Sequence, residues 1–420
     1  MNFGKETAII MKPFLKAFGQ CDEPTPLNKD DQKSYQTILL ALYNDIFTAN
    51  ETIFKEACFQ SKLITERRDF KQPEGKNSRY FPAHIQKYIE ANEQVQLVFT
   101  CGNVGQREIS IIFTLFSKIE LKDRQFYTQY VKMMYIWLHI CGKYANANCT
   151  ESLNVFIYPT PFNKNLPTSP ATTIGPEHIN TAFTMACAKN GQIIIFREEE
   201  WFKVFIHETF HSYGLDFATN DQASLQNVLR TIFPINSEFD IYEAYTETWA
   251  RIINCVFCSF NALPAQSKRD QKGFLLNLNF CLEMERMFAM YQCIKILGFM
   301  GLRYSDLYIN SINSINSYNS SSNHLRSLYK ENTHVFAYYI MTAIFLNDYQ
   351  GFMLWCKKNN TNLLRFKATP ETFKSFGTYI SSQYDCISLL NNIAQLSDLN
   401  QKVNKSKNKT LMTTTRMSLI

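Results

Sequence analysis

Trp201-Phe-Lys-Val-Phe-Ile-His-Glu-Thr-Phe-His-Ser-Tyr-Gly214 contains the pattern His-Glu-x-x-His. On a helix, His207 and His211 lie one turn apart, so both imidazoles project from one face toward a single metal ion. Glu208 lies beside them, where a carboxylate can take a proton from an activated water. The pattern therefore predicts a zinc site with a general base next to it.

The residues around this pattern support the same prediction. Gly191–Phe196 is an apolar run typical of a buried strand, Glu198–Glu200 favour a helix N-terminus, and Gly214 is placed to end the helix. A strand followed by a metal-bearing helix is the context that the pattern requires. The alternative is a helix with two hydrogen-bonded histidines and a surface glutamate, but two of only seven histidines fall in this one turn.

A zinc site needs a third protein ligand, and the best candidate lies further along the chain. In Glu238–Ala250, apolar residues at helical spacing predict a helix that buries one side. Glu243 and Glu247 lie one turn apart on one face, where two like charges repel unless a cation offsets them. Glu243 as a zinc ligand, with Glu247 accepting from a ligating imidazole, uses both carboxylates. The alternative is an exposed acidic first turn favoured by the helix dipole.

The combination of His207-Glu208-Thr-Phe-His211 with a downstream Glu243-x-x-x-Glu247 resembles the gluzincin metallopeptidases. The stretch that begins at Glu243 is similar to the third-ligand helix of lethal-factor-type toxins. The resemblance implies that His207, His211 and Glu243 bind Zn2+, and that Glu208 acts as general base and then as acid. It also implies that a tyrosine or histidine stabilises the oxyanion. Tyr245 is the leading candidate for that role, and the alternatives are Tyr213, Tyr242, His178, His324 and His334.

Two other resemblances involve the same segment. The residues His207–Phe217, together with the Asn-, Lys-, Tyr- and Phe-rich composition, are similar to uncharacterised zincin-like proteins of large DNA viruses. The pattern also opens the metzincin signature, which requires His or Asp three residues after Gly214. Phe217 stands at that position, Asp216 comes one residue early, and no Met-turn follows. The gluzincin resemblance is therefore the closer of the two peptidase classes.

The apolar pattern predicts an α+β fold that is mainly helical, in which a zincin-like core with a small mixed or antiparallel sheet precedes a helical C-terminal part. Predicted strands cover residues 95–99, 108–113, 153–158, 178–183 and 192–196. We expect five segments: an N-terminal helical region (1–94), the zincin-like metallopeptidase core (95–309), a low-complexity loop (310–323), a C-terminal helical region (324–399) and a basic disordered tail (400–420).

Composition and charge exclude several classes of function. The net charge of +6 is mild and the basic residues are dispersed, so no specific nucleic-acid partner is expected. No apolar run has the length of a transmembrane helix. The tail is basic and contains no acid, so an acidic partner could bind it. The twelve cysteines are scattered, many within apolar runs, which predicts free thiols in a reducing, cytoplasmic compartment, or in the host cytoplasm or virion if the protein is viral.

These observations predict a zinc-dependent metallopeptidase that hydrolyses a peptide or protein substrate. Any of the predicted strands could offer its edge to an extended peptide. The alternative is a non-catalytic structural or interaction protein on a zincin-like scaffold, for example a virion component. The intact Glu208 favours the enzyme, because a purely structural zinc site needs no base. The long unassigned flanks and the basic tail favour the structural role.

Overall fold

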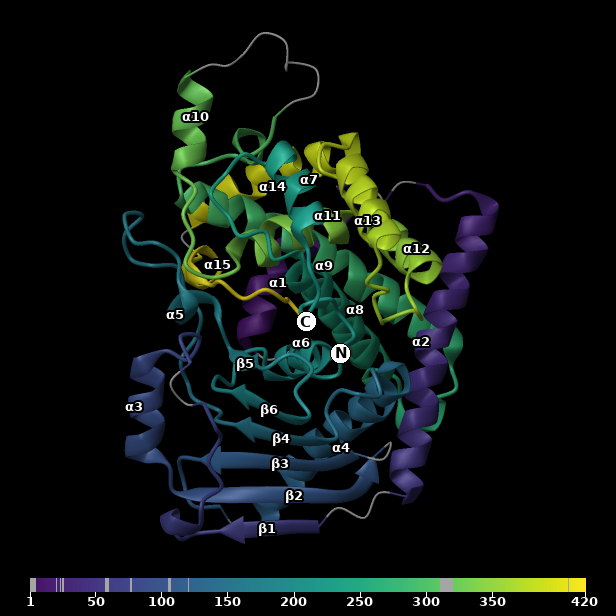
Figure 1. Cartoon of the computed structure of the whole chain (residues 1–420), viewed down its shortest axis with the longest axis vertical. Helices are drawn as coiled ribbons and strands as arrows, with labels where there is room; N and C mark the ends of the chain where they lie inside the picture. Colours follow the sequence, from purple (N-terminus) through teal and green to yellow (C-terminus); the bar gives the residue numbers. More distant parts are fainter. Residues whose placement is uncertain are drawn as a thin grey trace.

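The chain forms a mainly helical α+β structure in which a six-stranded mixed sheet lies at one end and most helices pack at the other (Figure 1). The computed structural model describes residues 5–420 except 20, 23, 25, 57–59, 76–77, 105–106, 120, 310–319 and 407. The predicted fold class, α+β and mainly helical, is confirmed at this level. None of the helices in the described part of the chain is long and apolar enough to span a membrane.

The sheet has the strand order β1-β2-β3-β4-β6-β5. β4 pairs in parallel with β3 and with β6, whereas the other neighbouring strands are antiparallel. β5 is the edge strand next to the helices (Figure 1). The strands are β1 Gln60–Ile64, β2 Val95–Val104, β3 Arg107–Leu115, β4 Ser152–Ile157, β5 Ala182–Thr184 and β6 Asn190–Ile195.

A different layer covers each face of the sheet. Ile193 of β6 belongs to the large apolar cluster on the face where helix α4 (Leu121–Tyr144) packs. Its neighbour Ile194 belongs to a smaller cluster on the other face, closed by Ile85 of helix α3 (Ala83–Asn92). Successive strand residues point to opposite faces, so burial of both faces requires the continuous apolar run that β6 shows in the sequence.

Most of the other helices form the thick layer beyond β5, and α2 also runs alongside the sheet (Figure 1). The other helices are α1 Lys5–Ala17, α2 Lys29–Glu56, α5 Pro176–Ile179, α7 Ala223–Ile232, α9 Gln271–Phe299, α10 Ser320–Ser327, the π-helix η4 Phe336–Met341, α11 Thr342–Asn347, α12 Tyr349–Asn359, α13 Pro370–Gln383, α14 Ile387–Ser406 and α15 Lys409–Thr413. Three short 3-10 helices lie at η1 Arg67–Asp69, η2 Ala265–Ser267 and η3 Tyr304–Asp306.

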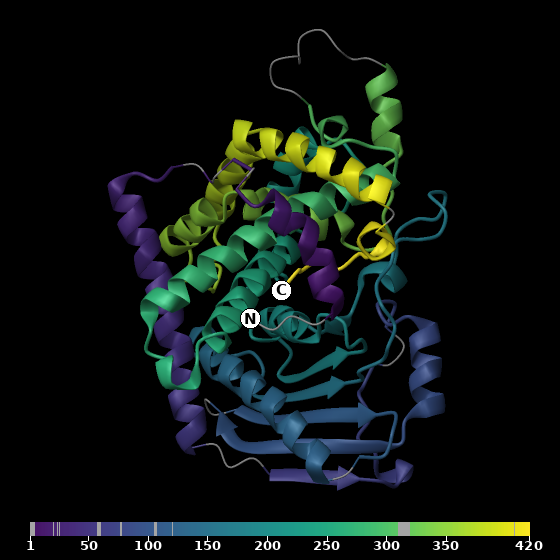
Figure 2. The same ribbon diagram turned by 180° about the vertical axis from the view of Figure 1, so that it is seen from behind.

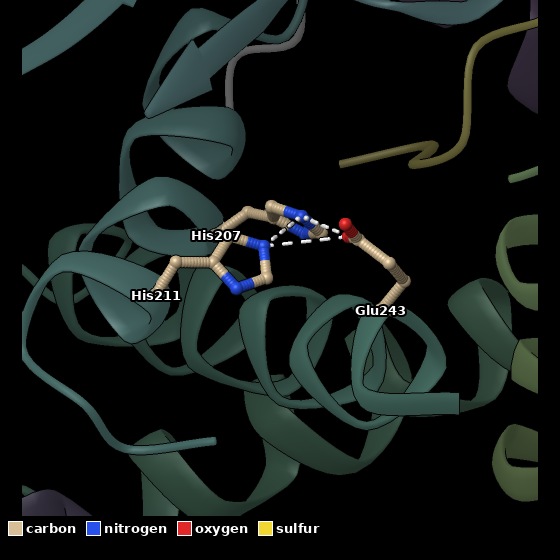
Figure 3. Close-up of side chains that lie close together, drawn as sticks. All are labelled: His207, His211 and Glu243. Carbon is tan, nitrogen blue, oxygen red and sulfur yellow. Dashed lines mark hydrogen bonds and ion pairs between the residues drawn. The ribbon is translucent and has the colours of Figure 1, made fainter. Parts of the chain in front are cut away.

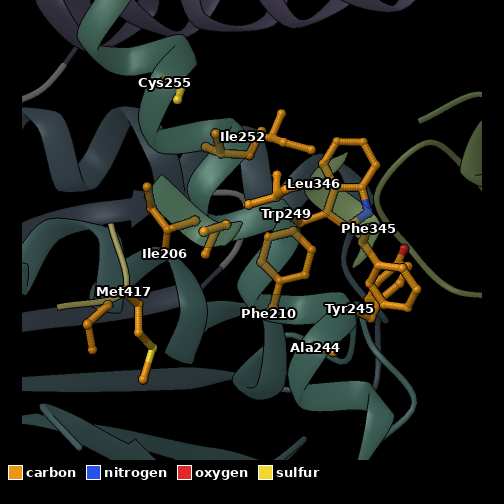
Figure 4. Packing of buried hydrophobic residues seen from close by; sticks show 14 of the residues in the cluster. Ile206, Phe210, Ala244, Tyr245, Trp249, Ile252, Cys255, Phe345, Leu346 and Met417 are labelled. Carbon is orange, nitrogen blue, oxygen red and sulfur yellow. The ribbon is translucent and has the colours of Figure 1, made fainter. Parts of the chain in front are cut away.

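Two buried helices carry the candidate site. Helix α6 (Trp201–Ser212) follows β6, and helix α8 (Ile241–Asn261) packs against α6 and α9. Ile206 and Phe210 of α6 share an apolar cluster with Trp249 of α8 (Figure 4). Close packing of this kind fixes the two helices relative to one another, and with them the polar side chains that they present to each other.

Local elements differ from the prediction at three places. Within the N-terminal region predicted to be helical (1–94), residues 60–64 form strand β1, because they pair with the free edge of β2. Residues 178–183, predicted as a strand, divide between α5 and β5, because Pro176 is placed to start a helical turn. In the predicted low-complexity loop, residues 310–319 lie outside the described residues, and residues 320–323 begin α10.

The C-terminal tail, predicted to be disordered, forms helix α15 and then a buried end at residues 414–419, while its described lysines stay exposed. After α15 the chain runs as an extended segment toward the centre of the molecule (Figure 2). Leu419 is fully buried, and the backbone N–H groups of Met417 and Leu419 donate to the carboxylates of Glu200 and Glu285. Burial of the tail's apolar end and satisfaction of its backbone order this segment although its described lysines, on which the prediction was based, remain solvated.

Cys149 and Cys187 form a disulfide, which corrects the prediction of free thiols for this pair. The two cysteines are 38 residues apart in the sequence. They precede β4 and β6, and the parallel pairing of these strands brings the two segments side by side. Spacing along the chain contains no sign of that pairing. Cys141 and Cys356 are buried free thiols, as predicted.

Candidate metal centre

Three side chains from two helices converge on one point (Figure 3). Nε2 of His211 lies 3.0 Å from Nε2 of His207. Oε2 of Glu243 lies 3.1 Å from Nε2 of His207 and 3.3 Å from Nε2 of His211. All three side chains are buried. The structure thus brings together the two histidines of α6 and the glutamate of α8 that the sequence proposes as ligands of one metal ion.

The spacing of these donor atoms suits a tetrahedral metal ion. With metal–ligand bonds of about 2.0–2.2 Å, tetrahedral ligands lie roughly 3.3–3.6 Å apart. The separations of 3.0–3.3 Å in this cluster are close to that value. Two imidazoles and one carboxylate, with a fourth position left for water, are a donor set of catalytic zinc sites. The residues present therefore fit a metal ion of this kind.

A carboxylate supports each imidazole from behind. Nδ1 of His207 lies 3.0 Å from Oε2 of Glu247, and Nδ1 of His211 is hydrogen-bonded to Oδ2 of Asp216. An Nδ1–H that donates to a carboxylate leaves the lone pair of Nε2 free for a metal. Glu247 occupies the position that the sequence analysis assigns to it. Asp216 enters that analysis only as a displaced metzincin ligand, and the structure gives it a different role.

Charges at the three candidate ligands are strongly coupled. Burial acts to lower the pKa of His207, but hydrogen bonds to Glu243 and Glu247 outweigh this effect and raise it. Burial likewise opposes protonation of His211, yet Asp216 and Glu243 raise its pKa well above the ordinary value. For Glu243, burial acts to raise the pKa, but the two imidazoles hold it well below the usual range. A bound metal ion would replace the protons that balance this carboxylate, so metal binding releases protons.

Glu208 lies beside the ligands but takes a different role. Among the described residues, its carboxylate makes no hydrogen bond to the protein, and its side chain borders the cavity above the ligands. Burial raises the pKa of Glu208, although the neighbouring imidazoles act in the opposite direction. A carboxylate with a raised pKa at the wall of a cavity is suited to accept and return a proton.

The cavity above the ligands has a volume of about 320 Å³. Helices α6 and α8 form one wall, and β5 with the following residues Met185 and Ala186 forms another. Among the described strands, β5 has a neighbour on one side only. Its outer edge therefore offers backbone groups to which an extended chain could hydrogen-bond next to Glu208.

Tyr338 and His334 border the same cavity from the C-terminal half of the chain. The hydroxyl of Tyr338, on η4, donates to Oε2 of Glu243 at 3.0 Å. Burial and the Glu243 carboxylate raise the pKa of Tyr338 well above its ordinary value, so the hydroxyl remains a hydrogen-bond donor. Nδ1 of His334 lies 3.0 Å from Asp240. From the sequence, His334 is only an alternative for the oxyanion role, and Tyr338 has no recognisable signal because it lies in an ordinary apolar run.

Tyr245, predicted to stabilise the oxyanion, does not border the cavity. Its hydroxyl donates to the carbonyl of Leu364 at 2.8 Å and accepts from Nδ2 of Asn360 at 2.8 Å. Its ring is fully buried among apolar side chains (Figure 4). The reason is helical geometry, because Tyr245 follows Glu243 by two residues and therefore points about 200° away from it around α8. The alternatives Tyr213, His178 and His324 do not border the cavity either, whereas Tyr242 does.

Comparison with protein-family models, curated proteins and solved structures finds no match to the chain. What the chain can do chemically therefore follows from the site's own residues. They are two imidazoles and a carboxylate that converge on one point, a second carboxylate beside them, and a tyrosine hydroxyl bonded to the first carboxylate.

Proposed function

We propose that the chain is a zinc-dependent metallopeptidase of gluzincin type that uses Glu208 as its general base. The observation that carries the proposal is the unbonded carboxylate of Glu208 at a cavity beside three convergent metal ligands. Structural zinc sites are closed by four protein ligands, whereas catalytic sites keep three and leave one position for water. A site that only held the fold together would have no use for a base at this place.

The residues of the site divide the chemistry of peptide hydrolysis among them. His207, His211 and Glu243 would hold the zinc ion, which would supply a Lewis acid for the scissile carbonyl and for the attacking water. Glu208 accepts a proton from the attacking water and then donates it to the leaving amine. Tyr338, whose hydroxyl donates to Glu243 in the structure, would redirect this hydrogen bond to the oxygen on which negative charge develops, the role first proposed for Tyr245.

The edge of β5 supports a peptide as the substrate. An extended chain placed along β5 can form backbone hydrogen bonds with Ala182–Thr184 while its carbonyl group lies over the metal ligands. Such main-chain pairing gives affinity without demanding one particular side chain. The residues that line the cavity then discriminate among the side chains of the peptide substrate.

Zinc content and peptide cleavage test this proposal together. We expect about one zinc per chain in the wild type, and loss of zinc in Glu243→Ala, because two histidines alone hold the ion weakly. Glu90→Ala, on the exposed side of α3, is the matched control and should keep its zinc. The wild type should also cleave members of a diverse peptide mixture, as detected by mass spectrometry.

Each outcome separates the two candidate functions. Zinc in the wild type without cleavage of any peptide would support the alternative, a structural or interaction protein on this scaffold. Absence of zinc from wild type prepared without chelators would refute the metallopeptidase. Zinc retained by Glu243→Ala would show that the third ligand is another residue.

A further inference from the structure

Lys203 is a buried lysine one helical turn before His207 on α6. Its side chain is 2% exposed, and its Nζ donates to both carboxylate oxygens of Glu247, at 2.8 and 3.0 Å. Glu247 is itself fully buried. A lysine and a glutamate taken out of water in this way are kept only where each satisfies the other.

This ion pair reaches a metal ligand directly. Oε2 of Glu247 also lies 3.0 Å from Nδ1 of His207. Oε1 of Glu247 hydrogen-bonds only to Lys203 among the described residues. Lys203 thus holds the carboxylate by both oxygens and leaves one of them in position to accept from the imidazole. A chain of hydrogen bonds runs from Lys203 through Glu247 to His207.

We propose that Lys203 is a positioning residue of the metal centre, which orients His207 by clamping Glu247. The carboxylate could otherwise rotate about its last side-chain bond, and the imidazole that donates to it would follow. A group that supports a ligating histidine in this way governs the ligand's orientation without touching the metal. The inference rests on the proposed metal site and adds a residue one turn before His207 on the same face of α6.

The surroundings of Lys203 show that this pairing is specific. A second buried lysine, Lys164, lies nearby but pairs with Glu200 instead. Glu200 also accepts from the backbone N–H of Met417 at 3.1 Å, which fixes the C-terminal segment behind α6. The sulfur of Met417 lies 3.8 Å from Nζ of Lys203. Lys164 and the C-terminal segment together close the space around Lys203, and Glu247 remains its carboxylate partner.

Lys203→Met tests the proposal because it removes the ammonium group and keeps an unbranched side chain of similar length. We expect its zinc affinity, measured by competition with a chromophoric chelator on folded protein, to fall about 10- to 100-fold. In the zinc-loaded protein, the Nδ1–H resonance of His207 in imidazole-15N spectra should shift or disappear. Lys203→Arg should recover part of the affinity, since a cavity of about 30 Å³ borders this side chain.

Lys295→Met is the matched control. Lys295 is also buried and donates to the backbone of the C-terminal segment at Leu411, away from the metal ligands. Its replacement should lower stability but leave zinc affinity and the His207 resonance unchanged. If Lys203→Met does not fold, Lys203→Met combined with Glu247→Gln removes both buried charges, and the same weakening of zinc binding is expected.

The outcomes distinguish this inference from the proposed function. Equal zinc affinity in the wild type and Lys203→Met, with an unchanged His207 resonance, would overturn the role of Lys203 and leave the metallopeptidase intact. Equal loss of affinity in Lys203→Met and Lys295→Met would overturn it too, because the effect would then be general packing. A wild type that binds no zinc would overturn both.

Discussion

The hydroxyl of Tyr338 donates a 3.0 Å hydrogen bond to Oε2 of Glu243, although 95 residues separate the two in the sequence. This contact joins η4 to α8 and holds a tyrosine that borders the cavity against a candidate metal ligand. It also gives the candidate site a component from the C-terminal half of the chain.

Tyr338→Phe should slow peptide hydrolysis and leave zinc bound. Loss of one donor to a developing oxyanion lowers kcat by about 10²- to 10³-fold. Zinc content should match the wild type, because the three ligands remain. Tyr245→Phe is the control, since it removes a tyrosine hydroxyl of α8 that contacts Leu364 and Asn360 instead. It should lower stability by about 1 kcal/mol and keep kcat. A loss of kcat in Tyr245→Phe but not in Tyr338→Phe would show that Tyr245, as proposed from the sequence, stabilises the oxyanion.

Glu208→Gln should abolish hydrolysis and retain zinc. The amide keeps the size of the carboxylate but cannot accept a proton from water, and Glu208 is not among the convergent ligands. His207→Ala and His211→Ala should lose both zinc and activity. Rates of hydrolysis of one peptide substrate and the zinc content of each variant show whether activity alone, or both activity and zinc, are lost. Full activity in Glu208→Gln would exclude this residue as the base.

Asp216→Ala should weaken zinc binding about 10- to 100-fold, because Asp216 supports Nδ1 of His211. The carboxylate is held in place by Thr246 Oγ1, which donates to it at 3.1 Å, so it is rigid enough to orient the ring. Asp221→Ala, a change in an exposed residue of the same loop region, should bind zinc as the wild type does. Competition with a chelator at constant pH measures the zinc affinity of both variants. Equal zinc affinity in the two variants would show that Asp216 does not support His211 as a metal ligand.

Reduction of the Cys149–Cys187 disulfide should lower the free energy of unfolding by about 2–4 kcal/mol, because the bond closes a loop across 38 positions. The segment at Cys187 also contacts helix α6, since the backbone N–H of Cys187 donates to the carbonyl of His211 at 3.0 Å. Urea unfolding with and without reductant measures the effect, and a variant with both cysteines changed to serine should not respond to reductant. Free thiols at both positions in protein purified without reductant would contradict the pairing.

Asp348 should make stability depend on pH in a mildly acidic range. Burial raises the pKa of Asp348 to about 6 from an ordinary value of 3.8, despite a backbone hydrogen bond from Gly351 that acts in the opposite direction. The folded state therefore holds this proton more tightly than the unfolded state. Stability is lost as pH rises from about 4 to about 6, and the loss persists above that range.

Asp348→Asn removes this effect because asparagine can accept from Gly351 without a charge. The variant should match the wild type near pH 4 and be more stable by about 2–3 kcal/mol at pH 7. Asp30→Asn, at an exposed position, should follow the wild type across the range. Chemical unfolding at pH 4, 5.5 and 7 measures the three proteins. A constant difference at all three pH values would show that Asp348 does not titrate in this window.

Local periodicity explains how much of the site could be predicted. The interval between His207 and His211, and that between Glu243 and Glu247, each correspond to one helical turn, so each pair shares a face whatever the tertiary structure. The apolar runs of β2, β3, β4 and β6 are equally local signals, and the structure contains strands at these places. The prediction failed where it had to decide which face of a helix a side chain lies on, or which distant residue it contacts. Tyr245 lies two residues after Glu243, and two residues along a helix lead to the opposite side.

The sequence alone determined which residue types could form a metal centre, because helix geometry turns a spacing of four residues into a shared face. It also determined the mainly helical α+β class through the periods of its apolar residues. Only the tertiary structure decided that Tyr338 reaches Glu243, that Lys203 pairs with Glu247, and that residues 414–419 at the end of the tail are buried. These contacts join residues that are 44 to 214 positions apart. They depend on how helices pack against one another, and no local period of the sequence encodes that packing.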